Sequence, residues 1–198
     1  MSHVQPVSIS KIIPLSLCCE GCQQTAQPPY AVAQDGSSNY NTMIDAGLTA
    51  PNNNIVQYYI QTKQGTYNEY VQIEEWQTNI VLIGEGMDKT IISRNKSFGG
   101  GIGTYHTTTM ACNSTCIIDL MTVCFSLLRV SIRRFQDSLY TDFGKQFYTE
   151  CKILGTIDFI CGDAAGVFQN CLIEARIPLH DQYITITTQQ RNIENEPT

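Results

Sequence analysis

Short apolar runs, rather than long amphipathic stretches, dominate this chain. From residue 56 onward, segments rich in β-branched residues are each a few residues long and alternate with Gly, Asn and Asp. This pattern predicts short strands bounded by turns. No later segment sustains a 3.6-residue period, which argues against a doubly wound α/β sheet. The predicted strands are Val56–Ile60, Ile80–Ile83, Thr90–Ser93, Met110–Cys112, Ile117–Val123, Phe125–Ile132, Gln146–Ile153, Thr156–Ile160, Val167–Ile173 and Tyr183–Thr187.

One short helix is predicted ahead of these strands. Ile44 and Leu48 have the i, i+4 spacing of a single helix face. Asn41 or Thr42 can cap the start of the helix, and Pro51 ends the segment. The chain is therefore predicted to be all-β apart from this one helix.

Two architectures fit such a series of short strands, a β-sandwich and a parallel β-solenoid. The segments Cys151–Gly155 and Cys171–Ala175 resemble each other and begin 20 residues apart, at positions 151 and 171. A repeat of roughly 20 to 25 residues is the length of one solenoid coil. The recurrence favours stacked coils, each burying its inward face against its neighbours.

Composition narrows the class of partner. The 198 residues are enough for one domain with a sizeable core, and the formal net charge is −6. Binding to nucleic acid needs a basic face, so the charge argues against it. No apolar run reaches the roughly 20 residues that a membrane-spanning helix needs. We therefore expect neither nucleic acid nor a membrane as partner.

Residues 1–29 are predicted to be a poorly structured leader, and residues 30–198 to be the folded domain. The leader ends in Gln27-Pro28-Pro29, which disfavours a helix. Its apolar stretch, residues 12–19, is short, is interrupted by Pro14 and follows a single lysine, so it resembles the apolar region of a signal peptide only weakly and is not assigned as one.

Nine cysteines are many for a chain of this size, and an odd number leaves at least one thiol unpaired. A zinc site would need ligand pairs at recognisable spacing. The three histidines, at positions 3, 106 and 180, are scattered. No metal site is predicted.

Two aspartates are the main candidates for chemistry. Asp137 and Asp158 are separated by 21 residues, from position 137 to position 158. If the chain forms a solenoid, residues one coil apart stack, which brings both carboxylates within reach of one substrate. Such a pair can divide into a neutral acid and a charged base or nucleophile. The alternative is that each aspartate closes a turn between strands.

The sequences around these acids resemble those of the plant-type pectinesterases (pectin methylesterases), which are right-handed parallel β-helices. The resemblance runs in order over residues 30–198. It rests on Ala33-Gln34-Asp35-Gly36-Ser37-Ser38-Asn39-Tyr40, Gly65-Thr66-Tyr67-Asn68-Glu69, Leu82-Ile83-Gly84-Glu85-Gly86, Gln136-Asp137-Ser138-Leu139-Tyr140, Gly155-Thr156-Ile157-Asp158-Phe159-Ile160-Cys161-Gly162, Val167-Phe168-Gln169-Asn170-Cys171 and Thr187-Thr188-Gln189-Gln190-Arg191, the last similar to the family's "TAQGR".

The resemblance implies catalytic roles. Asp158 matches the nucleophile that forms an acyl-enzyme, and Asp137 matches the general acid that protonates the departing methanol. Gln136 matches an amide donor to the oxyanion, and Thr104 matches a substrate-contacting threonine. The competing interpretations are an inward amide ladder for Gln136 and strand-edge packing for Thr104.

The resemblance also implies partners and a location. The expected substrate is methyl-esterified pectin, and a pectinesterase-inhibitor protein is a further candidate partner. We expect a monomer without a cofactor, secreted to the cell wall.

Three departures from the family lead to a second hypothesis. Cys124 occupies the place of the family's first glutamine donor. About a dozen residues are missing before Gln136, and the family's "LGRPW" segment does not follow Arg191. We therefore expect the final coils to be absent. The rival to an active esterase is an impaired or inactive relative that at most binds pectin or an inhibitor.

Overall fold

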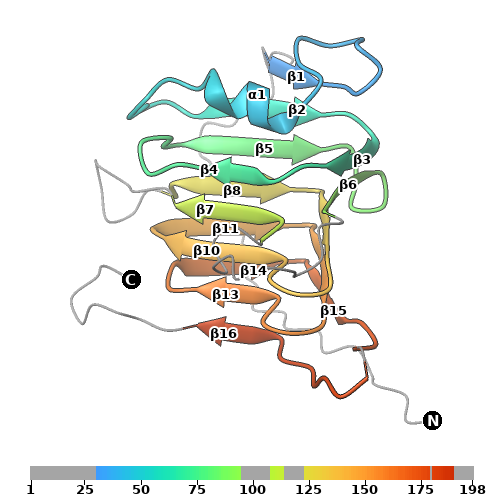
Figure 1. The fold of residues 1–198 in the computed structure, drawn as a ribbon. Helices are drawn as coiled ribbons and strands as arrows, with labels where there is room; N and C mark the ends of the chain where they lie inside the picture. Colours follow the sequence, from blue (N-terminus) through green and yellow to red (C-terminus); the bar gives the residue numbers. More distant parts are fainter. Residues whose placement is uncertain (1–29, 95–107, 114–122, 179, 190–198) are drawn as a thin grey trace, which may run out of the picture.

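The computed structural model describes residues 30–94, 108–113, 123–178 and 180–189. In these residues three parallel sheets are stacked around a common interior (Figure 1). In spatial order, the first sheet contains β1 (Tyr30–Val32), β2 (Tyr58–Thr62), β5 (Ile80–Gly84), β8 (Phe125–Leu128), β11 (Lys145–Thr149) and β14 (Ala165–Gln169). The second contains β3 (Gly65–Asn68), β6 (Thr90–Ser93), β9 (Ser131–Arg133), β12 (Lys152–Gly155) and β15 (Leu172–Ala175). The third contains β4 (Val71–Ile73), β7 (Met110–Asn113), β10 (Leu139–Phe143), β13 (Ile160–Gly162) and β16 (Thr187–Gln189).

From β2 onward each coil places one strand in each sheet, and β1 adds one further strand to the first sheet, so the chain forms a right-handed parallel β-helix. Lys152 lies opposite Leu172 in the second sheet, and Leu139 lies opposite Ile160 in the third. All strand pairs among the described residues are parallel, which excludes the β-sandwich. The predicted solenoid is confirmed.

The interior is built from columns of apolar side chains that run through successive coils. Tyr148 is fully buried, and its ring stacks on Phe168 of the next coil with centroids 4.7 Å apart. Such offset-stacked pairs stabilise a core beyond the area that they bury. In the first sheet this column comprises Tyr30, Ile60, Leu82, Leu127, Tyr148 and Phe168.

Left-handed residues turn the corner between the first and second sheets. Arg129, Glu150 and Asn170 have φ values of 55°, 53° and 52°, and each follows a strand of the first sheet. Three strand predictions are wrong at this corner, because a strand cannot continue through an αL residue. The runs predicted as single strands, Phe125–Ile132, Gln146–Ile153 and Val167–Ile173, are each two strands.

Other strand predictions differ from the structure in extent. The predicted strand Thr156–Ile160 is wrong over most of its length, because β13 begins only at Ile160. Most of Ile117–Val123 lies outside the described residues. The runs Val56–Ile60 and Tyr183–Thr187 overlap β2 and β16, which begin at Tyr58 and Thr187. Strands β1, β3, β4 and β10 had no predicted counterpart.

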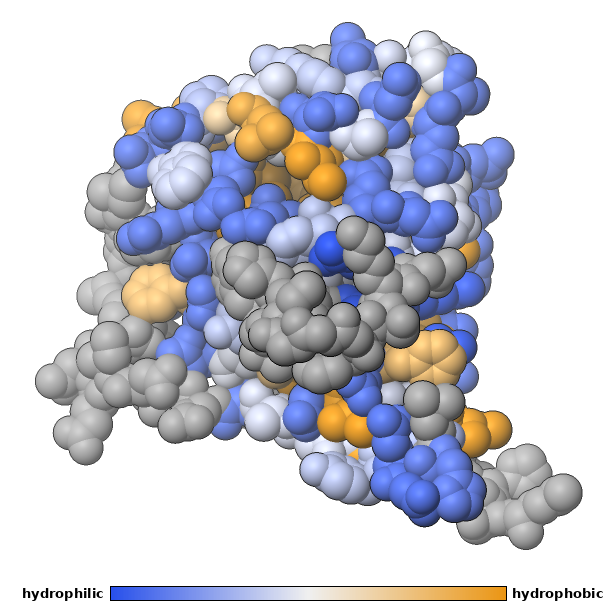
Figure 2. Space-filling view, viewed as in Figure 1, coloured by the Kyte–Doolittle hydropathy of each residue, from blue (hydrophilic) through white to orange (hydrophobic). Residues whose placement is uncertain are grey.

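The predicted helix is α1 (Met43–Leu48), and Thr42 caps it by accepting a hydrogen bond from the Asp45 N–H. The Glu69 carboxylate from the first coil accepts further bonds from the N–H groups of Met43 (2.9 Å) and Ile44 (3.2 Å). The helix exposes Ile44 and Leu48, and apolar atoms gather over this region in Figure 2. No helix in the described part of the chain is both long and apolar enough to cross a bilayer.

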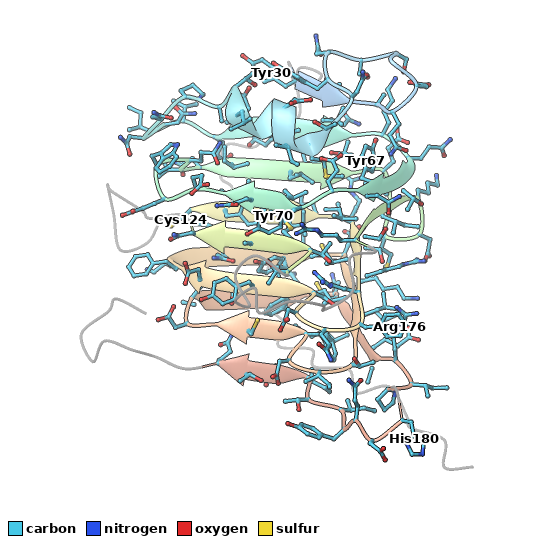
Figure 3. The ribbon with its side chains drawn as sticks, viewed as in Figure 1. Tyr30, Tyr67, Tyr70, Cys124, Arg176 and His180 are labelled. Carbon is cyan, nitrogen blue, oxygen red and sulfur yellow. The ribbon has the colours of Figure 1, made fainter. Side chains whose placement is uncertain are left out.

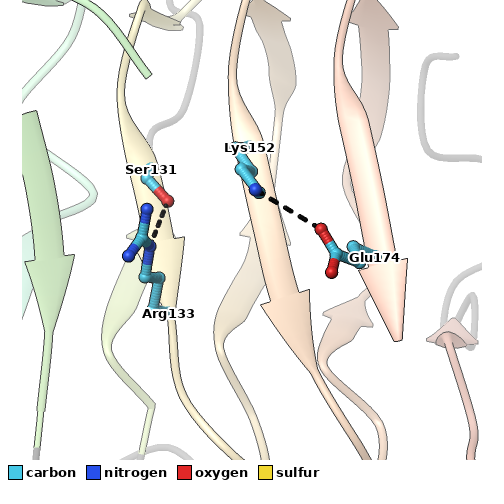
Figure 4. Close-up of polar contacts among 4 residues, drawn as sticks. All are labelled: Ser131, Arg133, Lys152 and Glu174. Carbon is cyan, nitrogen blue, oxygen red and sulfur yellow. Dashed lines mark hydrogen bonds and ion pairs between the residues drawn. The ribbon is translucent and has the colours of Figure 1, made fainter. Parts of the chain in front are cut away.

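The second sheet presents polar contacts on its outer face (Figure 4). Lys152 on β12 pairs with Glu174 on β15 at 3.4 Å, and Arg133 donates to the Ser131 hydroxyl on its own strand, β9. A partly exposed ion pair of this kind contributes on the order of 0.5 kcal/mol. The stacking of the coils therefore depends on the buried columns more than on these contacts.

Candidate active site

Asp137 and Asp158 occupy equivalent positions in consecutive coils. Gln136 pairs with Ile157 in a parallel bridge, and the Asp137 N–H donates to the Ile157 carbonyl at 3.3 Å. Each aspartate lies two residues before a strand of the third sheet, β10 and β13 respectively. The spacing of 21 residues therefore corresponds to one coil, as the sequence predicted.

The two aspartates also share an unusual backbone conformation. Their φ values are 48° and 47°, in the left-handed region that Asp and Asn tolerate better than most residues. The interpretation of each aspartate as a turn residue is therefore compatible with its proximity to the other. The αL conformation is not itself a sign of catalysis, because Arg129 and Glu150 adopt it at a purely structural corner.

The environments of the two carboxylates differ. Asp137 is buried, with 7% of its surface exposed, and lies near Arg134. Burial lowers the pKa of the Arg134 guanidinium, and the Asp137 charge opposes that change. Asp158 is half-buried, and its Oδ1 accepts a hydrogen bond from the Thr188 hydroxyl. Different surroundings are what allow two carboxyl groups to take different roles.

The thiol of Cys161 lies in the field of both acids. Burial raises its pKa to about 12, and the charges of Asp137 and Asp158 add to the effect. The thiol is consequently neutral at physiological pH. The Cys161 side chain therefore lies near both carboxylates, on the outer side of the third sheet.

A second pair of carboxyl groups follows on the same strands. Asp142 on β10 and Asp163 just after β13 continue the register in which Tyr140 lies opposite Cys161. Burial raises the pKa of Asp142, and the charge of Asp163 adds to it, while a hydrogen bond from Tyr140 acts in the opposite direction. The face beside the two candidate catalytic acids is therefore acidic.

Gln136 is half-buried and directly precedes Asp137. The fully buried amide in this region is Gln146, whose Nε2 donates to the carbonyls of Cys112 and Phe143, both at 2.9 Å. Gln146 is thus an inward amide of this region, and the two interpretations of Gln136 as an amide donor or an inward amide both remain predictions.

Two further predicted positions can be placed only in part. Thr104 lies outside the described residues. Cys124 is buried and disulfide-bonded, so it offers no thiol at the place of the family's first glutamine. Among the described residues no group of three or more His, Cys, Asp or Glu side chains could hold a metal ion.

Sequence reasoning missed one residue at this site, Thr188, and one beside it, Arg176. Thr188 contacts Asp158 from the following coil. Arg176, labelled in Figure 3, places its guanidinium 4.3 Å from the ring centroid of Phe135, the residue before Gln136. Coil spacing alone predicts a neighbour of Asp158 about 21 residues further on, near position 179, which is nine residues short of Thr188 and does not identify it.

Fold and site together define the class of this protein. It is a parallel β-helix with two stacked carboxyl groups, each two residues before a strand of the third sheet. The family model described as "Pectinesterase" matches residues 30–126 and 119–198. The chain belongs to the pectinesterase family.

Curated relatives and solved structures agree with this assignment. The chain is 42% identical over 188 residues to the pectinesterase/pectinesterase inhibitor PPE8B of Prunus persica, covering 84% of this chain and 36% of that protein. It is 38% identical to the Arabidopsis thaliana protein named "Probable pectinesterase/pectinesterase inhibitor 12", covering 84% of this chain and 34% of that one.

The pectin methylesterase from carrot has a similar structure, with a TM-score of 0.69 and 31% identity over 87% of this chain and 60% of that one. A mutant pectin methylesterase in complex with a hexasaccharide gives a TM-score of 0.55 at 25% identity, covering 74% of this chain and 55% of that one. The chain spans about a third of the length of the curated relatives that it matches.

Proposed function

We propose that this chain is a carboxylic ester hydrolase that removes methyl esters from the galacturonate units of pectin. The observation that carries the proposal is the placement of Asp137 and Asp158 in the same αL position of consecutive coils. Membership of the pectinesterase family supports the reaction class.

The proposed mechanism has two steps. The Asp158 carboxylate attacks the C6 ester carbonyl, a tetrahedral oxyanion forms, and methanol leaves with the proton of Asp137. Water then attacks the acyl-enzyme and gives one proton to Asp137, and the bond from the acyl carbon to Asp158 breaks, which restores the Asp158 carboxylate. The product leaves as galacturonic acid, which loses its remaining proton to solvent. Each step conserves atoms and charge, and neither needs a cofactor.

Gln136 is proposed to donate its amide N–H to the oxyanion, because it directly precedes Asp137 in the chain and is only half-buried. Loss of one such donor in other hydrolases costs about 3 kcal/mol. Thr104 remains a proposed substrate contact.

The proposed substrate is supported by the hexasaccharide complex of a structural relative. The cell wall is the proposed location, on the basis of the plant relatives, and a pectinesterase-inhibitor protein is a proposed partner.

A binding protein without turnover is the second candidate. The disulfide at Cys124 favours it, because the buried sulfur cannot replace an amide donor to the oxyanion. Such a relative would retain the outer face of the third sheet but lack part of the stabilisation of the transition state.

Methanol release from highly esterified pectin separates the two candidates. The purified chain is compared with Asp158→Asn and Asp137→Asn, each checked for a native circular dichroism spectrum. Release that falls by at least ~1,000-fold in Asp158→Asn supports the esterase. Folded wild-type protein that binds pectin without releasing methanol supports the second candidate.

A further inference from the structure

The carboxylate of Asp158 has a hydrogen-bond donor from the next coil. The Thr188 hydroxyl on β16 donates to Asp158 Oδ1, although the two residues are 30 positions apart. We propose that Thr188 is a positioning residue that orients the Asp158 carboxylate for attack on the ester, an inference that rests on the proposed function.

The backbone holds Thr188 in place from both sides of Asp158. The Thr185 N–H donates to the Thr156 carbonyl at 3.0 Å, and the Ile160 N–H donates to the Ile186 carbonyl at 3.0 Å. Strand β16 is thereby paired with β13, with Thr188 opposite Cys161. The position of the hydroxyl is therefore set by the sheet.

The side chain of Thr188 is on the same outer face as the site. Tyr140, Cys161 and Thr188 are consecutive members of one column in the third sheet. A threonine side chain is restricted at χ1, so its hydroxyl has few alternative directions. The donor is consequently preorganised toward Asp158.

One hydroxyl can bind only one of the two carboxylate oxygens at a time. With Oδ1 engaged by Thr188, rotation of the carboxylate is restricted, and Oδ2 is the oxygen left to act as nucleophile. Holding a reacting group in its productive orientation lowers the entropic cost of the reaction. The effect falls on turnover rather than on substrate binding, because Thr188 acts through Asp158.

The resemblance to a family motif sets this donor apart. In the resemblance to "TAQGR", Thr188 stands where that motif has an alanine, which has no donor. The chain therefore provides a donor to the candidate nucleophile at a position where the motif has none.

The test compares Thr188→Val, which keeps the shape and removes the hydroxyl, with Thr188→Ser, which keeps the hydroxyl. Thr187→Val is the control on the same strand. In Thr188→Val we expect kcat for methanol release to fall roughly tenfold with KM changed less than about twofold. Thr188→Ser should recover most of the kcat, and Thr187→Val should match the wild type. A Thr188→Val variant with wild-type kcat, or a Thr188→Ser variant as slow as Thr188→Val, overturns the proposal.

A second readout does not depend on turnover. With 13C-labelled aspartate, the Asp158 carboxyl resonance is assigned as the signal missing in Asp158→Asn. It should move in Thr188→Val and keep its wild-type position in Thr188→Ser and Thr187→Val. If the wild-type chain releases no methanol, the proposed function fails, and with it the role in attack, while this resonance still decides separately whether Thr188 holds the Asp158 carboxylate. An Asp158 signal that is identical in all variants overturns the inference about Thr188.

Discussion

The thiol of Cys161 is the most unusual single group beside the two acids. Burial, reinforced by Asp137 and Asp158, raises its pKa to about 12 from an ordinary value of 9.0. The native protein should therefore react with iodoacetamide at Cys161 at least tenfold more slowly at pH 8 than the urea-unfolded chain does.

Mass spectrometry of the Cys161 peptide after timed labelling measures this rate. The proposed carboxylate cluster also predicts that Asp158→Asn speeds labelling, because one of the neighbouring negative charges is removed. Equal labelling rates in the native and unfolded chains would contradict the arrangement.

The stacked carboxyl groups of Asp142 and Asp163 give a prediction about stability. Burial and the charge of Asp163 raise the pKa of Asp142 from its ordinary value of 3.8. A carboxyl group whose pKa is raised by folding favours the native state when protonated, and this stabilisation is lost as the pH rises through its unfolded and then its folded pKa.

At pH 7, Asp142→Asn should therefore raise the free energy of unfolding by roughly 0.5 kcal/mol, a small value because solvent screens a partly exposed pair. Urea unfolding at pH 7 and at pH 3.5 measures the change, and the gain should shrink at the lower pH. A variant that is less stable than wild type at pH 7 would contradict this account, and Asp88→Asn, at an exposed position before β6, serves as a charge-matched control.

At the scale of elements, the end of β13 depends on a glycine. Gly162 has φ = 118°, and a Cβ atom there would lie 2.0 Å from the Thr141 carbonyl oxygen on β10. Because both the backbone conformation and the neighbouring strand oppose a side chain, Gly162→Ala should cost about 3 kcal/mol or more.

Gly47 in α1 is the matched control. A Cβ atom at this position would meet nothing within 4 Å, so Gly47→Ala should stabilise the chain by about 0.5–1 kcal/mol. Chemical unfolding of both variants checks the pair. A Gly162→Ala variant as stable as wild type would show that β10 and β13 do not approach as closely as described.

The elements that the sequence predicted well are those marked by apolar residues. Ile80–Ile83 and Thr90–Ser93 coincide with β5 and β6 to within a residue, because both have β-branched runs bounded by turn formers. Two strands were predicted as one at the corners where Arg129 and Glu150 adopt the αL conformation, because the side chains of these residues do not favour that conformation. Only Asn170, at the third such corner, has a turn-forming side chain.

The candidate site was also predictable only in part. The stacking of Asp137 and Asp158 followed from their spacing, because one coil sets the distance between residues in adjacent layers. The contribution of Thr188 could not be predicted, because β16 follows an irregular segment whose length no coil repeat determines. Register is well specified only where one face of a strand is buried, and the side chains of β16 are exposed.

At the scale of the whole molecule, the negative charge of the protein should affect how tightly it binds the proposed pectin substrate. The chain has a formal net charge of −6, and Asp142 and Asp163 lie on the same outer face as the candidate acids. Each ester that the proposed reaction removes leaves a negative galacturonate on the substrate. Repulsion between protein and product therefore increases as de-esterification proceeds.

Salt screens this repulsion, because the Debye length falls to about 10 Å at 0.1 M. For partly de-esterified oligogalacturonides we expect KM to decrease roughly twofold to fivefold when NaCl is raised from about 20 mM to about 200 mM. Fully esterified oligomers of the same length are the control, and their KM should stay constant. Short oligomers keep polymer swelling out of the comparison.

Asp142→Asn combined with Asp163→Asn locates the effect. If the acidic pair beside the site causes the repulsion, the double variant should lose most of the salt dependence while its KM for the fully esterified oligomer stays the same. If the salt dependence persists unchanged, the repulsion comes from the net charge of the whole molecule. A KM that rises with salt for the charged oligomers would instead mean that cationic side chains dominate the substrate contact, and the acidic face would then lie away from the bound polymer.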